Sequence, residues 1–189
     1  MRHPPTPSIL SSESLPRTWL MTDARNDQCL ESVIFRLPAG SGIIFRHYHL
    51  GNNARRERFM TIRRLARKKR HLLLLADRAG RARRWGADGI HGRQWLSARN
   101  SDLIQSAPVH NRQEITDAKR NQADLFFLSP VFPTRSHPAA AGLPNVQTRK
   151  LAALCNGPVI LLGGMSAARF RHMRHVGAHG WAAIDSLMR

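Results

Sequence analysis

The residues from 133 to 138 combine side chains that bind oxyanions. Between two prolines this stretch holds two hydroxyl and two basic side chains: Thr134, Arg135, Ser136 and His137. Hydroxyls can donate hydrogen bonds and basic groups add positive charge, which suits the oxygen atoms of phosphate or pyrophosphate. The prolines restrict the turn and lower the cost of ordering it. We therefore expect an anion-binding turn, with a rigid surface loop carrying incidental polar residues as the alternative.

A glycine pair ends another apolar stretch, VILLGGM at 159–165. Gly163 and Gly164 are followed by Met165 and by Ser166, a candidate helix N-cap. Backbone amides and a helix N-terminus at such a turn can meet an anion. An ordinary glycine turn is the alternative interpretation.

Three further apolar runs end in side chains that can do chemistry. Arg46 follows IIF, Asp77 follows LLLLA and His110 follows SAPV. If these runs are strands of a parallel barrel, their carboxyl ends open at the same mouth, where barrel enzymes hold their active sites. An arginine, an aspartate and a histidine meeting at one mouth indicate a functional site.

The elements that would position these residues are short apolar runs alternating with longer, often basic segments. This alternation is typical of strand and helix units around a parallel sheet. Eight runs are strand candidates: 17–23, 41–48, 71–77, 87–92, 102–110, 124–132, 158–165 and 180–187. Six segments are helix candidates: 26–37, 54–69, 78–85, 111–122, 145–155 and 166–176.

Eight such units predict an α/β fold, a single-domain (β/α)8 TIM barrel, rather than a doubly wound open sheet. Apolar residues at helical spacing, such as Phe59, Ile62 and Leu65, support the helices. The length of 189 residues demands compact loops, a reduced element after the fourth strand and a truncated last unit with no helix after the eighth. We expect a disordered N-terminal tail over residues 1–16 and the barrel domain over residues 17–189.

Composition limits the partners. Lys and Arg number 30 against 12 Asp and Glu, a formal charge of +18, which predicts attraction to polyanions. The basic segments at 55–70 and 78–84 carry no nucleic-acid recognition motif, so we interpret them as solvated outer faces of helices. Two cysteines, Cys29 and Cys155, predict neither a disulfide framework nor a zinc site, and no run suits a signal peptide or membrane span. A cytoplasmic location follows as an expectation.

The sequence resembles the thiamine phosphate synthase family, including its TenI-type thiazole tautomerase relatives. The likeness rests on IIFRHY (43–48), LADRAGRARRWGADGIH (75–91), PVFPTRSH (130–137) and VILLGGM (159–165). It implies thiamine biosynthesis, in which a pyrimidine-methyl pyrophosphate ionises with Mg²⁺ assistance and a thiazole phosphate captures the cation.

The resemblance also implies roles for particular residues. Arg46, Thr134 and Ser136 would meet the pyrophosphate charge, and His137 stands where the family has a lysine. Asp77 matches a metal-binding aspartate, and Gly163 with Gly164 would accept the thiazole phosphate. His110, in SAPVHN, resembles the proton-transferring histidine of the tautomerase SVH segment.

Several positions depart from the family pattern. Ile44 and Tyr48 replace a glutamine and a lysine, Ala76 replaces an asparagine, and Asp185 stands where a serine would help hold phosphate. The second metal aspartate is absent, because the segment after GIH reads GRQWL. Three functions follow: synthase as the default, thiazole tautomerase as the alternative, and a non-catalytic barrel that binds a phosphorylated ligand or nucleic acid. Whether the chain forms a homo-oligomer stays open.

Overall fold

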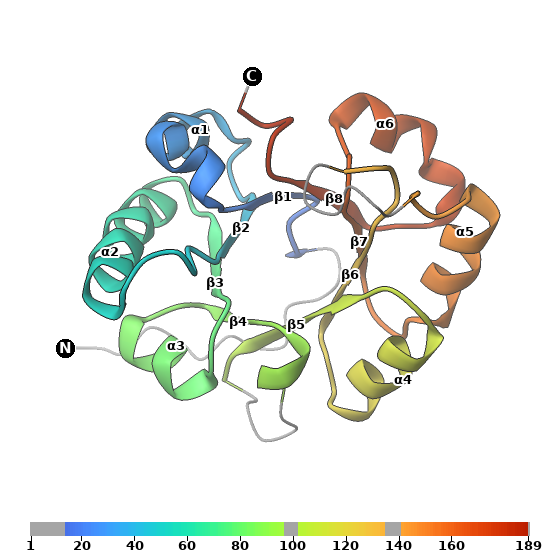
Figure 1. Cartoon of the computed structure of the whole chain (residues 1–189), viewed down its shortest axis with the longest axis horizontal. Coiled ribbons are helices and arrows are strands. Elements are labelled where there is room, and N and C mark those ends of the chain that lie inside the picture. Colours follow the sequence, from blue (N-terminus) through green and yellow to red (C-terminus); the bar gives the residue numbers. More distant parts are fainter. Residues whose placement is uncertain (1–13, 97–101, 135–140, 189) are drawn as a thin grey trace.

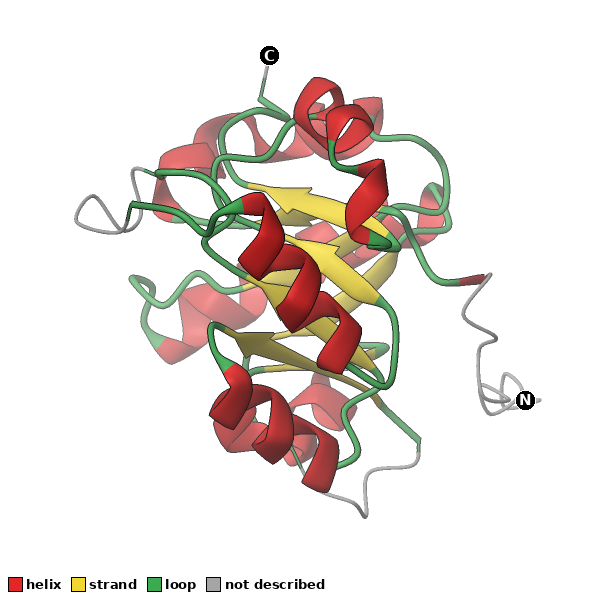
Figure 2. Cartoon of the chain, turned by 90° about the vertical axis from the view of Figure 1, so that its right-hand side faces the viewer, coloured by secondary structure: helices red, strands yellow, loops and turns green. Residues whose placement is uncertain are grey.

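A computed structural model of the protein describes residues 14–96, 102–134 and 141–188. Eight parallel strands close into a barrel in sequence order, and helices surround it (Figures 1 and 2). The strands are β1 (Thr18–Met21), β2 (Gly42–Phe45), β3 (Leu72–Leu75), β4 (Gly89–His91), β5 (Ile104–Val109), β6 (Leu125–Leu128), β7 (Val159–Leu161) and β8 (Gly180–Ala183). The predicted (β/α)8 barrel is confirmed.

In the part of the chain that the structure describes, six α-helices cover the outside of the barrel, and each lies within a segment predicted to be helical or extends at most two residues beyond it. They are α1 (Leu30–Arg36), α2 (Asn52–Lys68), α3 (Ala79–Trp85), α4 (Arg112–Arg120), α5 (Asn145–Leu154) and α6 (Ala167–His172). Between β4 and β5 the described residues form only a 3₁₀ turn, Arg93–Trp95, in place of the α-helix of the other units, and this is the reduced element that the length predicts. Within the described residues after β8, 184–188, no helix forms.

The barrel interior is filled by apolar side chains that alternate with outward-facing ones along each strand. Trp19 lies against Phe127 edge to face, with ring centroids 5.4 Å apart. Gly42 lies beside the Trp19 indole, where a Cβ atom would come within 2.1 Å of the ring. A glycine at this position of β2 therefore makes room for the largest interior side chain.

The last residues of the predicted N-terminal tail, 14–16, pack against the barrel. Residues 1–13 lie outside the described part of the chain, but residues 14–16 are described and Leu15 is buried in the interior cluster. The Leu15 carbonyl oxygen lies 2.9 Å from Nε2 of His179, and the Pro16 carbonyl accepts a hydrogen bond of 2.7 Å from the Trp19 indole. These contacts attach the segment before β1 to the barrel.

No helix among the described residues is both long and apolar enough to cross a membrane.

Candidate functional site

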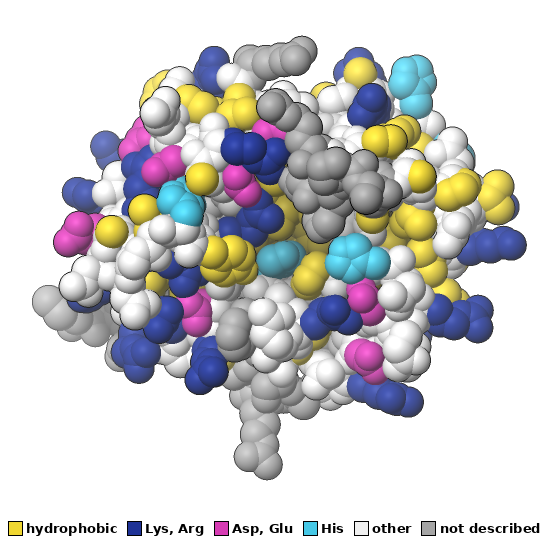
Figure 3. Space-filling model, in the orientation of Figure 1, with side chains coloured by type: hydrophobic (Ala, Val, Ile, Leu, Met, Phe, Trp, Pro, Cys, Tyr) yellow, Lys and Arg dark blue, Asp and Glu magenta, His cyan; other side chains and the backbone are white. Residues whose placement is uncertain are grey.

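A cavity of about 560 Å³ opens at the mouth of the barrel, beside the carboxyl ends of β6, β7 and β8. Its volume is in the range of small-molecule sites. Four of the predicted site residues line it: Arg46, Thr134, Gly163 and Gly164. Figure 3 shows apolar and histidine side chains at the centre of this face, with Lys and Arg around its edge.

Arg46 forms one wall of the cavity and is held in a fixed orientation. Its Nε donates to the Thr22 carbonyl oxygen at 2.9 Å, and one terminal nitrogen donates to the Asp23 carboxylate at 2.8 Å. Burial lowers the pKa of Arg46 from its usual value, and the charge of Asp23 opposes that shift. A guanidinium fixed in this way can stabilise charge that develops in the cavity without first reorganising.

The glycine pair after β7 brings bare backbone to the opposite part of the cavity. Gly163 has φ +95° and Gly164 has φ +60°, both in the region that favours glycine. A Cβ atom on Gly163 would lie 2.8 Å from Cα of Pro130, and one on Gly164 would lie 2.8 Å from the carbonyl oxygen of Pro133. The loop after β6 and the turn after β7 therefore pack together because these residues lack side chains.

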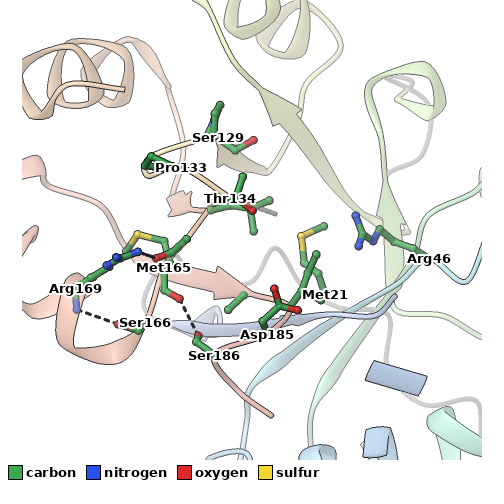
Figure 4. Close-up of a pocket in the computed structure, with 16 residues that line it drawn as sticks. Met21, Arg46, Ser129, Pro133, Thr134, Met165, Ser166, Arg169, Asp185 and Ser186 are labelled. Atoms are coloured by element: carbon green, nitrogen blue, oxygen red, sulfur yellow. Dashed lines mark hydrogen bonds between the residues drawn. The ribbon is translucent and has the colours of Figure 1, made fainter. Parts of the chain in front are cut away.

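Other polar groups of the cavity were not singled out from the sequence. Arg169 lies across the cavity from Arg46, with Thr134 and Asp185 between them (Figure 4). The Arg169 guanidinium donates to the Gly164 carbonyl and lies over the Phe132 ring, 4.6 Å from its centroid. Its place three residues after the N-cap Ser166, on a short exposed helix, gives no sequence signal that distinguishes it from other basic residues.

The residues beside β8 give the cavity a mixed charge. Asp185, predicted to disfavour phosphate, lines the cavity, and its Oδ2 lies 3.4 Å from the Arg25 guanidinium. The neighbouring Ser186 also lines the cavity and donates to the Met165 carbonyl oxygen at 2.7 Å.

Asp77 lies at the end of β3 but is not among the residues that line the cavity. Its Oδ2 accepts hydrogen bonds from Arg55 at 2.6 Å and from Arg81 at 2.8 Å, and its Oδ1 accepts from the backbone N–H of Arg78 at 2.8 Å. Burial alone would raise the pKa of Asp77, but these hydrogen bonds and the two arginine charges hold it below its usual value. The carboxylate is therefore held in its ionised form, and both of its oxygens accept hydrogen bonds.

This arrangement does not fit a magnesium site. Mg²⁺ needs oxygen ligands in near-octahedral geometry, usually with one or two carboxylates. Here both oxygens of Asp77 already accept hydrogen bonds, and two guanidinium groups would repel a dication. The 3₁₀ turn after β4 places Arg93, rather than a second carboxylate, in the segment where the family has one.

His110 directly follows β5, is exposed and is not among the residues that line the cavity. Its Nδ1 lies 2.7 Å from Oε2 of Glu114, which also accepts from the His110 backbone N–H at 2.8 Å. Arg93 approaches the other oxygen of Glu114 at 3.1 Å. Glu114 thus orients the imidazole.

The other two predicted ligand-binding residues, Ser136 and His137, lie outside the described residues.

The cluster of Asp27, His47 and His49 near the end of β2 also has spacing suited to a metal, with ligand atoms within 4.8 Å of one another. However, Thr22 and Asp27 take the two ring nitrogens of His47 at 2.7 and 2.9 Å. Arg58 also donates to Asp27 at 2.6 Å. These hydrogen bonds tie the segment after β1 to β2 and α2, which is a structural role.

Comparisons with known proteins bear on the family and the fold. A family model described as thiamine monophosphate synthase matches residues 19–187. The thiamine-phosphate synthase of Pyrococcus furiosus is 27% identical over 91% of this chain and 86% of its own length. The thiamine-phosphate synthase of Desulfitobacterium hafniense is 32% identical over 61% of this chain and 60% of its own length. A solved thiamine phosphate pyrophosphorylase from P. furiosus superposes with a TM-score of 0.76 at 22% identity, covering 94% of this chain and 89% of that one.

Proposed function

Because this chain belongs to the thiamine monophosphate synthase family and so to thiamine biosynthesis, we propose that it joins a pyrimidine-methyl pyrophosphate to a thiazole phosphate. In this reaction the methylene C–O bond breaks, pyrophosphate leaves with the bonding electrons, and the thiazole nitrogen forms the new C–N bond. The product is thiamine phosphate.

The observation that carries this proposal is a single cavity with an anion-binding group at each side. Arg46 stands on one side and Arg169, which donates to the Gly164 carbonyl of the glycine turn, stands on the other, with Thr134 between them. Two phosphorylated substrates need two separate anion sites, and a cavity of about 560 Å³ can hold their heterocycles between those sites.

Each residue has a role in this scheme. Arg46 and Thr134 stabilise the charge that develops on the leaving pyrophosphate, which is the largest charge change of the reaction. Gly163 and Gly164 hold the thiazole phosphate by backbone contacts, in a turn whose positive φ angles favour glycine. Ser136 and His137, to which the resemblance gives a pyrophosphate-binding role, lie outside the described residues. The free thiols of Cys29 and Cys155 support a reducing compartment, the cytoplasm.

The test is to mix the purified chain with both substrates and follow thiamine phosphate by mass, in parallel with Mg²⁺ and with EDTA. We expect product above a no-enzyme control and a large loss of rate in Arg46→Ala, since the variant removes the cation of the cavity wall. An absence of product under both conditions, while ligands still bind, would reject the synthase proposal.

A thiazole tautomerase is the second candidate, favoured by the oriented His110 imidazole. With Glu114 fixing its Nδ1 side, the ring can move a proton on a thiazole carboxylate phosphate through Nε2. The distinguishing measurement is the conversion of that thiazole tautomer, followed by NMR. A severe loss in His110→Ala, with no loss in the exposed-surface control His172→Ala, would favour the tautomerase. If the chain binds its ligand but catalyses neither thiamine phosphate formation nor thiazole tautomerisation, it is the non-catalytic barrel.

A further inference from the structure

The buried guanidinium of Arg55 connects the ends of two neighbouring strands. Arg55 belongs to the first turn of α2, yet its side chain is only 6% exposed. Its Nε donates to the Arg46 carbonyl oxygen at 2.8 Å, and its two terminal nitrogens donate to the Asp77 carboxylate at 2.6 Å and to the Ala76 carbonyl at 3.0 Å. One side chain thus fixes the carboxyl ends of β2 and β3 relative to each other.

Aromatic rings enclose this guanidinium. Its central carbon lies 5.3 Å from the ring centroid of Tyr48, 5.8 Å from that of Trp85 and 5.9 Å from that of Phe45. Such faces favour a cation and exclude water from it. Tyr48 stands where the family has a lysine, so a residue that would bring a competing positive charge beside Arg55 is replaced by one that stabilises it.

The charges around Asp77 are complete without a metal. The Asp77 carboxylate forms salt bridges with Arg55 of α2 and with Arg81 of the first turn of α3. Arg55 and Arg81 with Asp77 form one ion-pair cluster, with two arginines to one carboxylate. The hydrogen bond from Arg55 to the Arg46 carbonyl links it to a second cluster, in which Arg25 and Arg46 balance Asp23 and Asp185. The excess positive charge therefore lies at Asp77. An excess of positive charge beside an anion site is what a bound divalent cation would otherwise provide.

We infer that the Arg55–Asp77–Arg81 cluster takes the place of a divalent metal site, so that this chain binds its pyrophosphate-bearing ligand without a metal ion. Arg55 is a positioning residue: through the Arg46 carbonyl it holds the end of β2, and Arg46 itself meets the ligand. The inference rests on the proposed function for the class of ligand, but it concerns metal dependence and not turnover.

The first experiment measures metal binding by the unmodified full chain. Mn²⁺, a paramagnetic substitute for Mg²⁺, is titrated into the protein, and the free ion is followed by electron paramagnetic resonance. We expect no saturable site in the wild type and the same trace in Asp77→Asn. Stoichiometric Mn²⁺ binding that disappears in Asp77→Asn would overturn the inference, and this measurement requires no enzymatic activity.

The second experiment measures the affinity for inorganic pyrophosphate by titration calorimetry, once with EDTA and once with Mg²⁺. We expect binding in EDTA that is at least as tight as in Mg²⁺, because Mg²⁺ would only compete for the pyrophosphate in solution. Arg55→Met is expected to weaken binding by roughly tenfold, and the exposed control Arg56→Met to leave it within about twofold. Arg55→Lys should restore little, because an ammonium cannot make three hydrogen bonds in the same plane.

The outcomes separate this inference from the proposed function. Pyrophosphate binding that requires Mg²⁺, or that is absent under both conditions, would overturn the metal-free site even if thiamine phosphate is formed. Metal-free binding without product would keep the inference and reject the synthase. If Arg55→Met fails to fold by circular dichroism, the wild-type titrations still decide the question.

Discussion

At the scale of single residues, Arg46 is the side chain whose loss we expect to weaken pyrophosphate binding most. Arg46→Ala removes a charge-assisted contact to the ligand and should weaken binding of inorganic pyrophosphate by roughly tenfold or more, measured by titration calorimetry. The matched control is Arg64→Ala, since Arg64 is exposed on the outer face of α2. Equal losses in the two variants would mean that overall charge, rather than the cavity, attracts the anion.

The buried His91 ring should make the free energy of unfolding depend on pH. Its ring is buried at the end of β4, where Nδ1 lies 2.9 Å from the Ser106 hydroxyl. Ser106 donates its own proton to the Ile90 carbonyl, so Nδ1 of His91 must carry a proton and donate it to the Ser106 hydroxyl. Burial lowers the pKa of His91 from 6.5 to about 3. Between these values the unfolded chain binds a proton that the folded chain does not, so stability falls as the pH falls.

The measurement is urea unfolding of the wild type and of His91→Gln at pH values near 7.5 and near 4.5. The wild type should lose about 2 kcal/mol more of its unfolding free energy than the variant over this range. Carboxylates titrate in both proteins and cancel in the difference. Parallel losses would show that His91 is protonated in the folded state or does not control the acid response.

At the scale of elements, the contact between the β6 loop and the β7 turn depends on Gly164. Alanine at φ +60° is strained, and its Cβ atom would meet the Pro133 carbonyl. Gly164→Ala should therefore lower the unfolding free energy by roughly 1 kcal/mol or more and also weaken phosphate binding. The control Gly80→Ala lies in α3 with open space around it and should be neutral or slightly stabilising. A stable Gly164→Ala with normal phosphate affinity would remove the turn from the site.

The elements themselves were predictable because the apolar runs are largely buried on both faces and because most of the helices, such as α2 and α4, bury an apolar stripe. The role of Arg55 was not, since Arg55 is one of nine basic residues in the segment 55–70. A signal was nevertheless present: Arg55, Phe59, Ile62 and Ala66 share helical spacing, and all four are buried. A basic residue on an apolar stripe therefore indicated a buried partner. The motif alone matches Asp77 to a metal-binding aspartate. Motif spacing gives no information on the arginines of α2 and α3 that form salt bridges with Asp77.

At the scale of the whole molecule, the formal charge of +18 predicts how the surface meets polyanions. Figure 3 shows Lys and Arg side chains around the edge of the mouth, with acidic side chains among them. Many basic residues of α2 and α6 are exposed, and Arg169 is the one among them that lines the cavity. A dispersed positive surface attracts phosphates without distinguishing base sequence.

We therefore expect weak, sequence-independent binding to duplex DNA or RNA, measured by fluorescence anisotropy with two unrelated oligonucleotides. The affinity should fall by roughly tenfold or more between about 50 mM and about 200 mM salt, because released counterions drive the association. Pyrophosphate should not compete at concentrations that fill the cavity, since the two anions use different surfaces. A complex that prefers one oligonucleotide and survives high salt would contradict this, and competition by pyrophosphate would move nucleic acid into the mouth of the barrel.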